Sequence, residues 1–126
     1  MATIRISVDE TSSFSIFDVE GTVNADDIAA AMVRQYVDGA PPHALWDYSR
    51  ATFHELNAGD YMRIASTAKS LAHNRPGGRT AFVAPGELEA VAIKFLEASS
   101  KLVALPIPLL ICATREDAVA WLTSQD

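Results

Sequence analysis

Residues 45–64, LWDYSRATFHELNAGDYMRI, contain a short apolar run, a polar stretch and the start of a helical pattern. The apolar run is typical of a buried strand, and from Tyr61 onward apolar residues recur every three or four positions, as on one face of a helix. Short apolar runs also occur at residues 79–84 and 108–113, again separated by longer segments of helical period. This alternation predicts strand–helix crossover units and a largely parallel sheet.

The first residues follow a different pattern. Residues 3–8 alternate, with Ile4, Ile6 and Val8 on one face, and a second, less regular run follows at residues 14–21. The two runs predict an antiparallel hairpin with a loop of about five residues. We therefore expect an α/β fold in which an N-terminal antiparallel hairpin joins a mainly parallel sheet of about five strands, with four helices.

Each predicted helix has an apolar face that should lie on the sheet. The first helix should end at Gly39, before two prolines. The predicted inward positions are Ile28, Met32, Val33 and Tyr36 in the first helix, Tyr61, Ile64, Ala65, Ala68, Leu71 and Ala72 in the second, Leu88, Val91, Ala92, Phe95 and Leu96 in the third, and Ala118, Trp121 and Leu122 in the fourth.

Four helix starts share one template, found at residues 23–28, 56–61, 83–88 and 113–118. Three of them offer a capping side chain, from Asn24, Asn57 and Thr114, that can accept from free amides of the first turn. The fourth places Pro85 at the first helical position. In each, an acid should stand third in the helix, near the positive end of its dipole. The polar cluster at residues 56–61 is therefore predicted to cap a helix.

Composition limits the possible functions. A chain of 126 residues with 49% hydrophobic and 21% charged residues predicts one globular domain, residues 1–126. A formal charge of −6 argues against nucleic acid as a partner, because phosphate binding needs a concentrated basic face. The single cysteine, Cys112, allows no internal disulfide or cysteine-based zinc site and is most simply a buried core residue. No apolar signal core or membrane span is present in the sequence, so we expect a cytoplasmic protein.

Three groups of polar residues are candidate sites. Asp47, Ser49 and His54 could suggest a hydrolytic triad, but no nucleophile elbow accompanies them, so we predict no catalytic residues. His43, His54 and His73 are far apart in sequence and predict no metal site. Arg75 and Arg79, beside two glycines, could bind an anion, although a helix-to-strand turn explains the same residues more simply. We expect no cofactor.

The apolar stretch at residues 102–113 predicts a last strand at the edge of the sheet, where Pro106 and Pro108 would limit further pairing. Three explanations of its apolar character compete: cover by the protein's own helices, cover by a second subunit, or one wall of a pocket for an apolar ligand. The candidate walls of such a pocket are Trp46, Tyr48, Met62, Phe95 and Leu109, each of which could equally be core.

Residues 45–64, together with GGRTAFVAP at 77–85 and EDAVAWL at 116–122, resemble the SpoIIAA-like proteins of the STAS and Sec14-like superfamily, which are small bacterial domains. The resemblance runs from about Ile4 to Leu122 and implies a superhelix of strand–helix units. In the anti-sigma-factor antagonists of that group, a strand ending in Asp-x-Ser, as at Asp47 and Ser49, precedes a phosphorylatable serine. That position falls at about Asn57 here, so the resemblance implies the fold without this switch.

The resemblance, with no catalytic constellation, implies a non-enzymatic protein-interaction or regulatory module of STAS type. Its partner would be another protein or a second copy. By analogy the contact surface is the loop after the third strand with the start of the second helix, comprising Arg50, His54, Glu55 and Asn57. The Sec14-like side of the resemblance implies the alternative, a carrier or sensor of a small apolar or lipid-like ligand.

Overall fold

The structure, a computed structural model, describes residues 2–9, 11, 13–37, 40–53, 55–84 and 86–124, without the side chain of Leu88. His54, Gly39 and Pro85, which entered the sequence predictions, lie outside the described residues. The elements along the chain are β1 (Thr3–Asp9), β2 (Phe14–Thr22), α1 (Ala25–Tyr36), β3 (His43–Thr52), α2 (Ala58–Leu71), the short 3-10 helix η1 (Ala72–Asn74), β4 (Thr80–Val83), α3 (Glu87–Leu102), β5 (Leu109–Cys112) and α4 (Arg115–Thr123).

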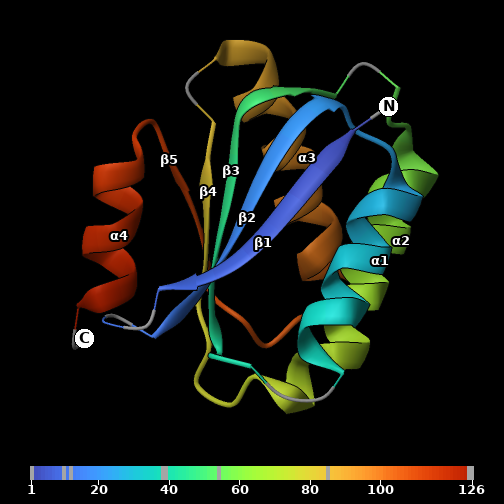
Figure 1. The fold of residues 1–126 in the computed structure, drawn as a ribbon. Helices are drawn as coiled ribbons and strands as arrows, with labels where there is room; N and C mark the ends of the chain where they lie inside the picture. The colour runs from blue at the N-terminus through green and yellow to red at the C-terminus, as the bar shows by residue number, and fades with distance from the viewer. Residues whose placement is uncertain are drawn as a thin grey trace.

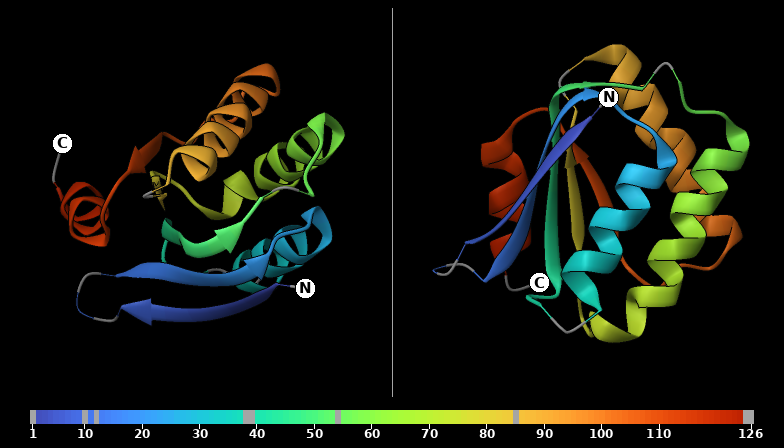
Figure 2. Two further views of the ribbon diagram at one scale, coloured as in Figure 1. Left: turned by 90° about the horizontal axis from the view of Figure 1, so that it is seen from above. Right: turned by 45° about the vertical axis from the view of Figure 1, so that its right-hand side comes forward.

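The five strands form one sheet in the order β1-β2-β3-β4-β5 (Figure 1). β1 pairs antiparallel with β2, and every later pair is parallel, which confirms the predicted hairpin and the predicted parallel sheet. Seen along the strands, α1, α2 and α3 lie side by side on one face, and α4 lies alone on the other (Figure 2). The molecule therefore has three layers, of which the α4 layer is incomplete.

The main core lies between the sheet and the three helices. Its centre is a row of aromatic rings on neighbouring strands, because residues paired across parallel strands point to the same face. The rings of Phe17 and Trp46 stack 3.9 Å apart at 3°, and Tyr48 continues the row. On the other face, a smaller core joins the sheet to Ala118 and Leu122 of α4. Trp121, also predicted to point inward, is half-buried there.

Three helix starts have the predicted caps. The side-chain oxygens of Asn24, Asn57 and Thr114 accept the backbone N–H three residues on, at 2.8, 2.9 and 3.1 Å. At Asn57 the carboxylate of Asp60 accepts the Asn57 N–H in return, at 3.0 Å, which completes a capping box.

The prediction for the fourth start was wrong. α3 begins at Glu87 after Gly86, so Glu87 is the first helical residue rather than the third. The first intrahelical bond runs from the Ala90 N–H to the Gly86 carbonyl at 3.0 Å, and Gly86 itself is extended. Ala84 has no side-chain acceptor for a first-turn amide, so nothing local fixes the helix start there, in contrast to Asn24, Asn57 and Thr114.

We expect Asn57→Ala to lower the free energy of unfolding by about 1 kcal/mol, since it removes the acceptor for a free amide of α2. Asn57→Asp keeps an acceptor and should leave stability within about 0.5 kcal/mol of the original value. Urea denaturation followed by circular dichroism measures both variants. Equal losses in the two variants would mean that the amide group acts there in some way other than capping.

Some predicted inward positions were wrong. Val33 of α1 and Val91 and Phe95 of α3 are exposed. α3 instead buries Ala92, Ile93 and Leu96, together with Ser99 and Ser100. Ser100 tolerates burial because its hydroxyl donates to the Leu96 carbonyl at 2.9 Å. Apolar residues occur on most sides of α3, so its sequence is compatible with more than one choice of buried face.

The apolar stretch at 102–113 does end in an edge strand, as predicted, but only Leu109–Cys112 forms it. The protein's own helices pack on both faces of this strand, although Leu110 is still 37% exposed. Cys112 packs in the α4 core, whereas Leu109 and Ile111 pack against the main core. Leu102, at the end of α3, is exposed and remains uncovered. None of the described helices is both long and apolar enough to cross a bilayer.

Candidate interaction site

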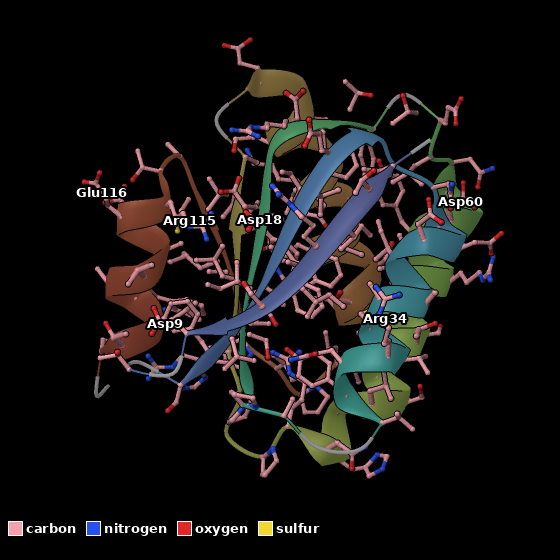
Figure 3. The ribbon with its side chains drawn as sticks, viewed as in Figure 1. Asp9, Asp18, Arg34, Asp60, Arg115 and Glu116 are labelled. Atoms are coloured by element: carbon pink, nitrogen blue, oxygen red, sulfur yellow. The ribbon has the colours of Figure 1, made fainter. Side chains whose placement is uncertain are left out.

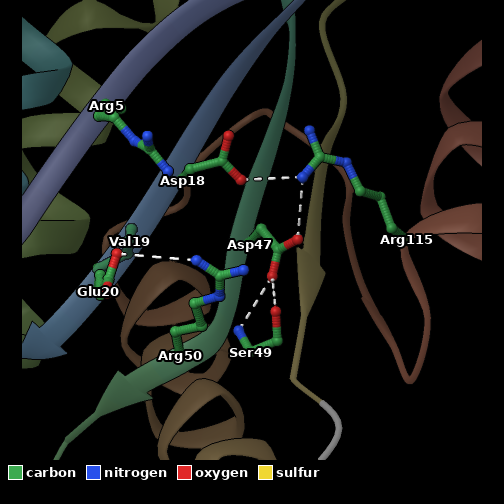
Figure 4. Close-up of a pocket in the computed structure, with 8 residues that line it drawn as sticks. All are labelled: Arg5, Asp18, Val19, Glu20, Asp47, Ser49, Arg50 and Arg115. Carbon is green, nitrogen blue, oxygen red and sulfur yellow. Dashed lines mark hydrogen bonds and ion pairs between the residues drawn. The ribbon is translucent and has the colours of Figure 1, made fainter.

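Asp47 of β3 accepts hydrogen bonds at both of its carboxylate oxygens. One carboxylate oxygen of Asp47 accepts the N–H of Ser49 at 3.0 Å and also the Ser49 hydroxyl. The other oxygen accepts from the Arg115 guanidinium at 3.2 Å, and the same Arg115 nitrogen donates to Asp18 at 2.9 Å (Figure 4). Because Arg115 opens α4, where the helix dipole disfavours a cation, these two carboxylates stabilise its charge.

These residues line a polar groove of about 240 Å³ beside α4, over β1, β2 and β3. The groove contains three arginines and three acids, so its charges balance. Arg50 and Glu20, both exposed, approach to 3.9 Å, which is a weak surface pair. Asp18 and Arg115 lie on the α4 side of the sheet, whereas Asp60 lies at the start of α2 (Figure 3). The lining residues are Arg5, Asp18, Val19, Glu20, Asp47, Ser49, Arg50 and Arg115.

Of the predicted partner-binding residues, Glu55 and Asn57 lie between β3 and α2, whereas Arg50, which was predicted to lie in the loop, belongs to β3. Arg50 and Glu55 are exposed, and His54 lies outside the described residues. Asn57 is exposed too, but its side chain and its backbone N–H are both engaged in the capping box. Arg50 and Glu55 are therefore the members of this set whose side chains are available to a partner.

Arg75 and Arg79, the two candidate anion-binding residues, both donate hydrogen bonds to acceptors of the protein itself. Arg75 is buried and donates to the carbonyls of Pro42 at 2.8 Å and Arg79 at 3.1 Å and to the Thr80 hydroxyl at 2.8 Å. Its guanidinium also lies over the Tyr36 ring, and burial lowers the pKa of Arg75. Arg79 donates to the Trp121 carbonyl at 2.8 Å and to Ser124. Both guanidinium groups already serve protein acceptors, which favours the turn over the anion site.

The five residues proposed as walls of an apolar pocket do not share one. Trp46, Tyr48 and Leu109 line a cavity of about 30 Å³, close to the space of a single water. Phe95 lines a separate hollow with Phe53, and Met62 lines neither. Sequence spacing did not separate these groups because Phe95 was assigned to the inward face of its helix.

The two described histidines, His43 and His73, have different environments. His43 Nδ1 accepts the Arg79 N–H at 3.0 Å, and His73 is exposed. Among the described residues, no group of three His, Cys, Asp or Glu side chains could hold a metal ion. Cys112 is buried, and its pKa is raised by burial and by Asp117.

His43 makes stability depend on pH. Burial, and then the charges of Arg79 and Arg75, lower the pKa of His43. Because the folded-state pKa lies below that of the unfolded chain, the unfolded state binds the proton first as pH falls below about 6.5. We therefore expect wild type to lose more stability than His43→Gln between about pH 7.5 and pH 5. Urea denaturation at each pH measures this, with His73→Gln as the control; parallel losses in wild type and His43→Gln would contradict it.

No protein-family model matches the sequence, and the comparison with curated proteins found no match. Among solved structures, the chain is similar to an anti-sigma factor antagonist from Mycobacterium paratuberculosis, with a TM-score of 0.64 and 19% identity over 98% of this chain and 96% of that chain. It is also similar to an uncharacterized protein of the DUF3478 family with a SpoIIAA-like fold from Shewanella loihica PV-4, with a TM-score of 0.57 and 19% identity over 96% of this chain and 93% of that chain.

These likenesses establish the fold. The antiparallel hairpin, the parallel strands and the four helices are those of the SpoIIAA-like, or STAS, fold, as the sequence resemblance predicted. At 19% identity they establish the fold alone.

Proposed function

We propose that this protein is a regulatory module of STAS type that acts by binding another protein. The observation that carries the proposal is the surface at the end of β3. There Arg50 and Glu55 are exposed, and the capping box at Asn57 fixes the conformation in which the loop meets α2. Because the capping box holds the first turn of α2 before a partner arrives, that turn loses little entropy on binding. An anti-sigma factor antagonist with the same fold supports a protein as the partner.

The binding needs no phosphorylation at the start of α2. No serine or threonine lies between Phe53 and Tyr61, and Asn57 occupies the expected acceptor position. A phosphate there would bring close to two negative charges beside Asp60, which already accepts the Asn57 N–H. This module would therefore be controlled by its amount or by its partner.

The polar groove has a structural role in this function. The Ser49 hydroxyl donates to the Asp47 carboxylate. The Asp47 carboxylate is in turn shared with the Ser49 N–H and Arg115. This network stabilises the end of β3 and the start of α4.

Site-specific photo-crosslinking in cells of the source organism tests the proposal. A photoreactive amino acid at position 55 should join the protein to one recurrent partner, and the same amino acid at exposed position 37 should not. The identified partner, purified and mixed with unphosphorylated protein, should bind wild type and lose about tenfold in affinity with Glu55→Lys or Arg50→Glu. Identical adducts from positions 37 and 55, or full affinity in both variants, would contradict it.

A further inference from the structure

β1 is an edge strand whose outer side is open. It comes first in the strand order, and none of the described helices or strands lies outside it (Figure 2). In an antiparallel pair, every second residue directs its N–H and C=O away from the neighbouring strand. Among the described residues, 3–8 make no backbone hydrogen bond besides those of the β1–β2 ladder. β1 therefore offers a row of main-chain donors and acceptors to a further strand.

The two edges of the sheet differ. β5 at the other edge has four residues and follows Pro106 and Pro108, which cannot donate a backbone hydrogen bond. β1 has seven residues, contains no proline and pairs with β2 in unbroken register. Short strands, prolines and bulges are among the features by which proteins prevent pairing at an edge. β5 has two of these features and β1 has none of the three.

The side chains of β1 form an apolar face and a polar face. On the side of the three helices, Ile4 and Ile6 pack against the main core, and Val8 is 43% exposed. On the side of α4, Arg5 and Ser7 are exposed. In the part of the chain that the structure describes, no carboxylate lies within ion-pair distance of Arg5. A strand that suits this edge has apolar residues on one face and no cation opposite Arg5 on the other.

We propose that β1 pairs antiparallel with β1 of a second copy of this chain, about a two-fold axis perpendicular to the sheet that passes between the two Ile6 residues. The two five-stranded sheets then form one continuous sheet with all six long helices of the core side on the same face. This register pairs all seven residues of the strand. The opposed residues are Ile6 with Ile6, Ile4 with Val8, Arg5 with Ser7, and Thr3 with Asp9.

The sequence of β1 is complementary to itself in this register, as a two-fold interface requires. Apolar residues meet apolar residues on the helix side, and no like charges are directly opposed. The neighbouring registers are poorer. An axis at Arg5 would oppose two guanidinium groups, and an axis at Ser7 would pair five residues instead of seven. An axis between two residues is disfavoured, because it would bring side chains of opposite faces together.

The interface is small. One pair of seven-residue strands buries less than about 1,200 Å², so we expect a dissociation constant of about 100 µM. The axis reverses the direction of every strand, so the ends of the two β3 strands would lie at opposite ends of the dimer. Arg50 and Glu55 would therefore be presented to two separate partner molecules. The dimer goes beyond the proposed function and does not depend on it.

Sedimentation equilibrium of the full chain from about 10 to 500 µM tests the proposal, and the mean mass should rise from 13.6 kDa toward twice that value. Ser7→Asp places a carboxylate opposite each Arg5 and should tighten the dimer about tenfold, whereas Ser7→Arg should weaken it at least about tenfold. Ser66→Asp and Ser66→Arg, at an exposed position of α2, should change nothing. Far-ultraviolet circular dichroism of each variant confirms folding.

Several results would overturn the proposal. A monomer at every concentration in both wild type and Ser7→Asp would exclude the dimer. A dimer that neither Ser7 variant affects would use another surface, and a dimer that Ser7→Asp weakens would have its axis elsewhere on β1. Amides of residues 3–8 that gain protection from hydrogen exchange only when the partner crosslinked at position 55 is added would identify a strand of that partner as the occupant. Glu55→Lys should leave the dimer unchanged, so the proposed function can fail independently.

Discussion

Arg75→Ala is expected to lower the free energy of unfolding by about 3–5 kcal/mol, one of the two largest losses in this molecule. The buried guanidinium donates to the carbonyls of Pro42 and Arg79 and to the Thr80 hydroxyl, and it packs over the Tyr36 ring. Alanine removes this donor from the Pro42 carbonyl and the Thr80 hydroxyl, whereas the Arg79 carbonyl still accepts the Ala44 N–H at 2.8 Å, and it opens a cavity where the side chain was. Thr80 begins β4 and Pro42 precedes β3, so the loss loosens two central strands together.

Arg75→Lys should recover part of this loss and remain about 2 kcal/mol less stable than wild type, because an ammonium group cannot span three acceptors as a planar fork does. Urea denaturation at neutral pH measures the series. Arg34→Ala, at an exposed position of α1, should stay within about 0.5 kcal/mol. A loss below about 1 kcal/mol in Arg75→Ala would contradict a structural role for the guanidinium.

Trp46→Ala is expected to cost about 3–5 kcal/mol, since the indole fills the centre of the main core. It stacks on Phe17 and adjoins Tyr48, and the only space beside it is the cavity of about 30 Å³ among the described residues. Phe95→Ala, with the ring more than half exposed, should cost less than about 1 kcal/mol.

The variants Trp46→Ala and Phe95→Ala together test whether Trp46 belongs to the core or lines a ligand pocket. In a carrier of apolar ligands, Trp46 would line a preformed space, and its loss would impair binding more than folding. Native mass spectrometry of freshly purified protein gives the complementary result, because a retained adduct of lipid size would favour the carrier. A cost below about 1 kcal/mol for Trp46→Ala together with such an adduct would contradict the core assignment.

The parts of the fold that the sequence predicts are those governed by local rules. Alternation at residues 3–8 predicts the first strand, and the side chains of Asn24, Asn57 and Thr114 predict three helix starts, because a cap bonds only three residues along the chain. The start of α3 was predicted wrongly because that segment has no capping side chain, and the helix begins after Gly86 without a side-chain cap.

The site depends on contacts that the sequence does not reveal. Arg115 binds Asp18 and Asp47, which lie 97 and 68 residues before it in the sequence. The residues around Asp47 therefore do not indicate this contact. Phe95 looks like a core residue because large aromatics are usually buried, but α3 turns Ala92, Ile93, Leu96, Ser99 and Ser100 inward, which leaves Phe95 on the exposed side.

Strand order in the sheet equals strand order in the chain, from β1 to β5. Each strand therefore pairs with the strand that precedes it in the chain, and every pairing after the β1–β2 hairpin closes a loop that contains a helix. α4 differs, because it packs on the far face and its Arg115 binds carboxylates that lie 97 and 68 residues earlier in the chain. In a nascent chain that ends before residue 115, Asp18 and Asp47 would lack this cation, and the polar groove would not yet have its balance of charges.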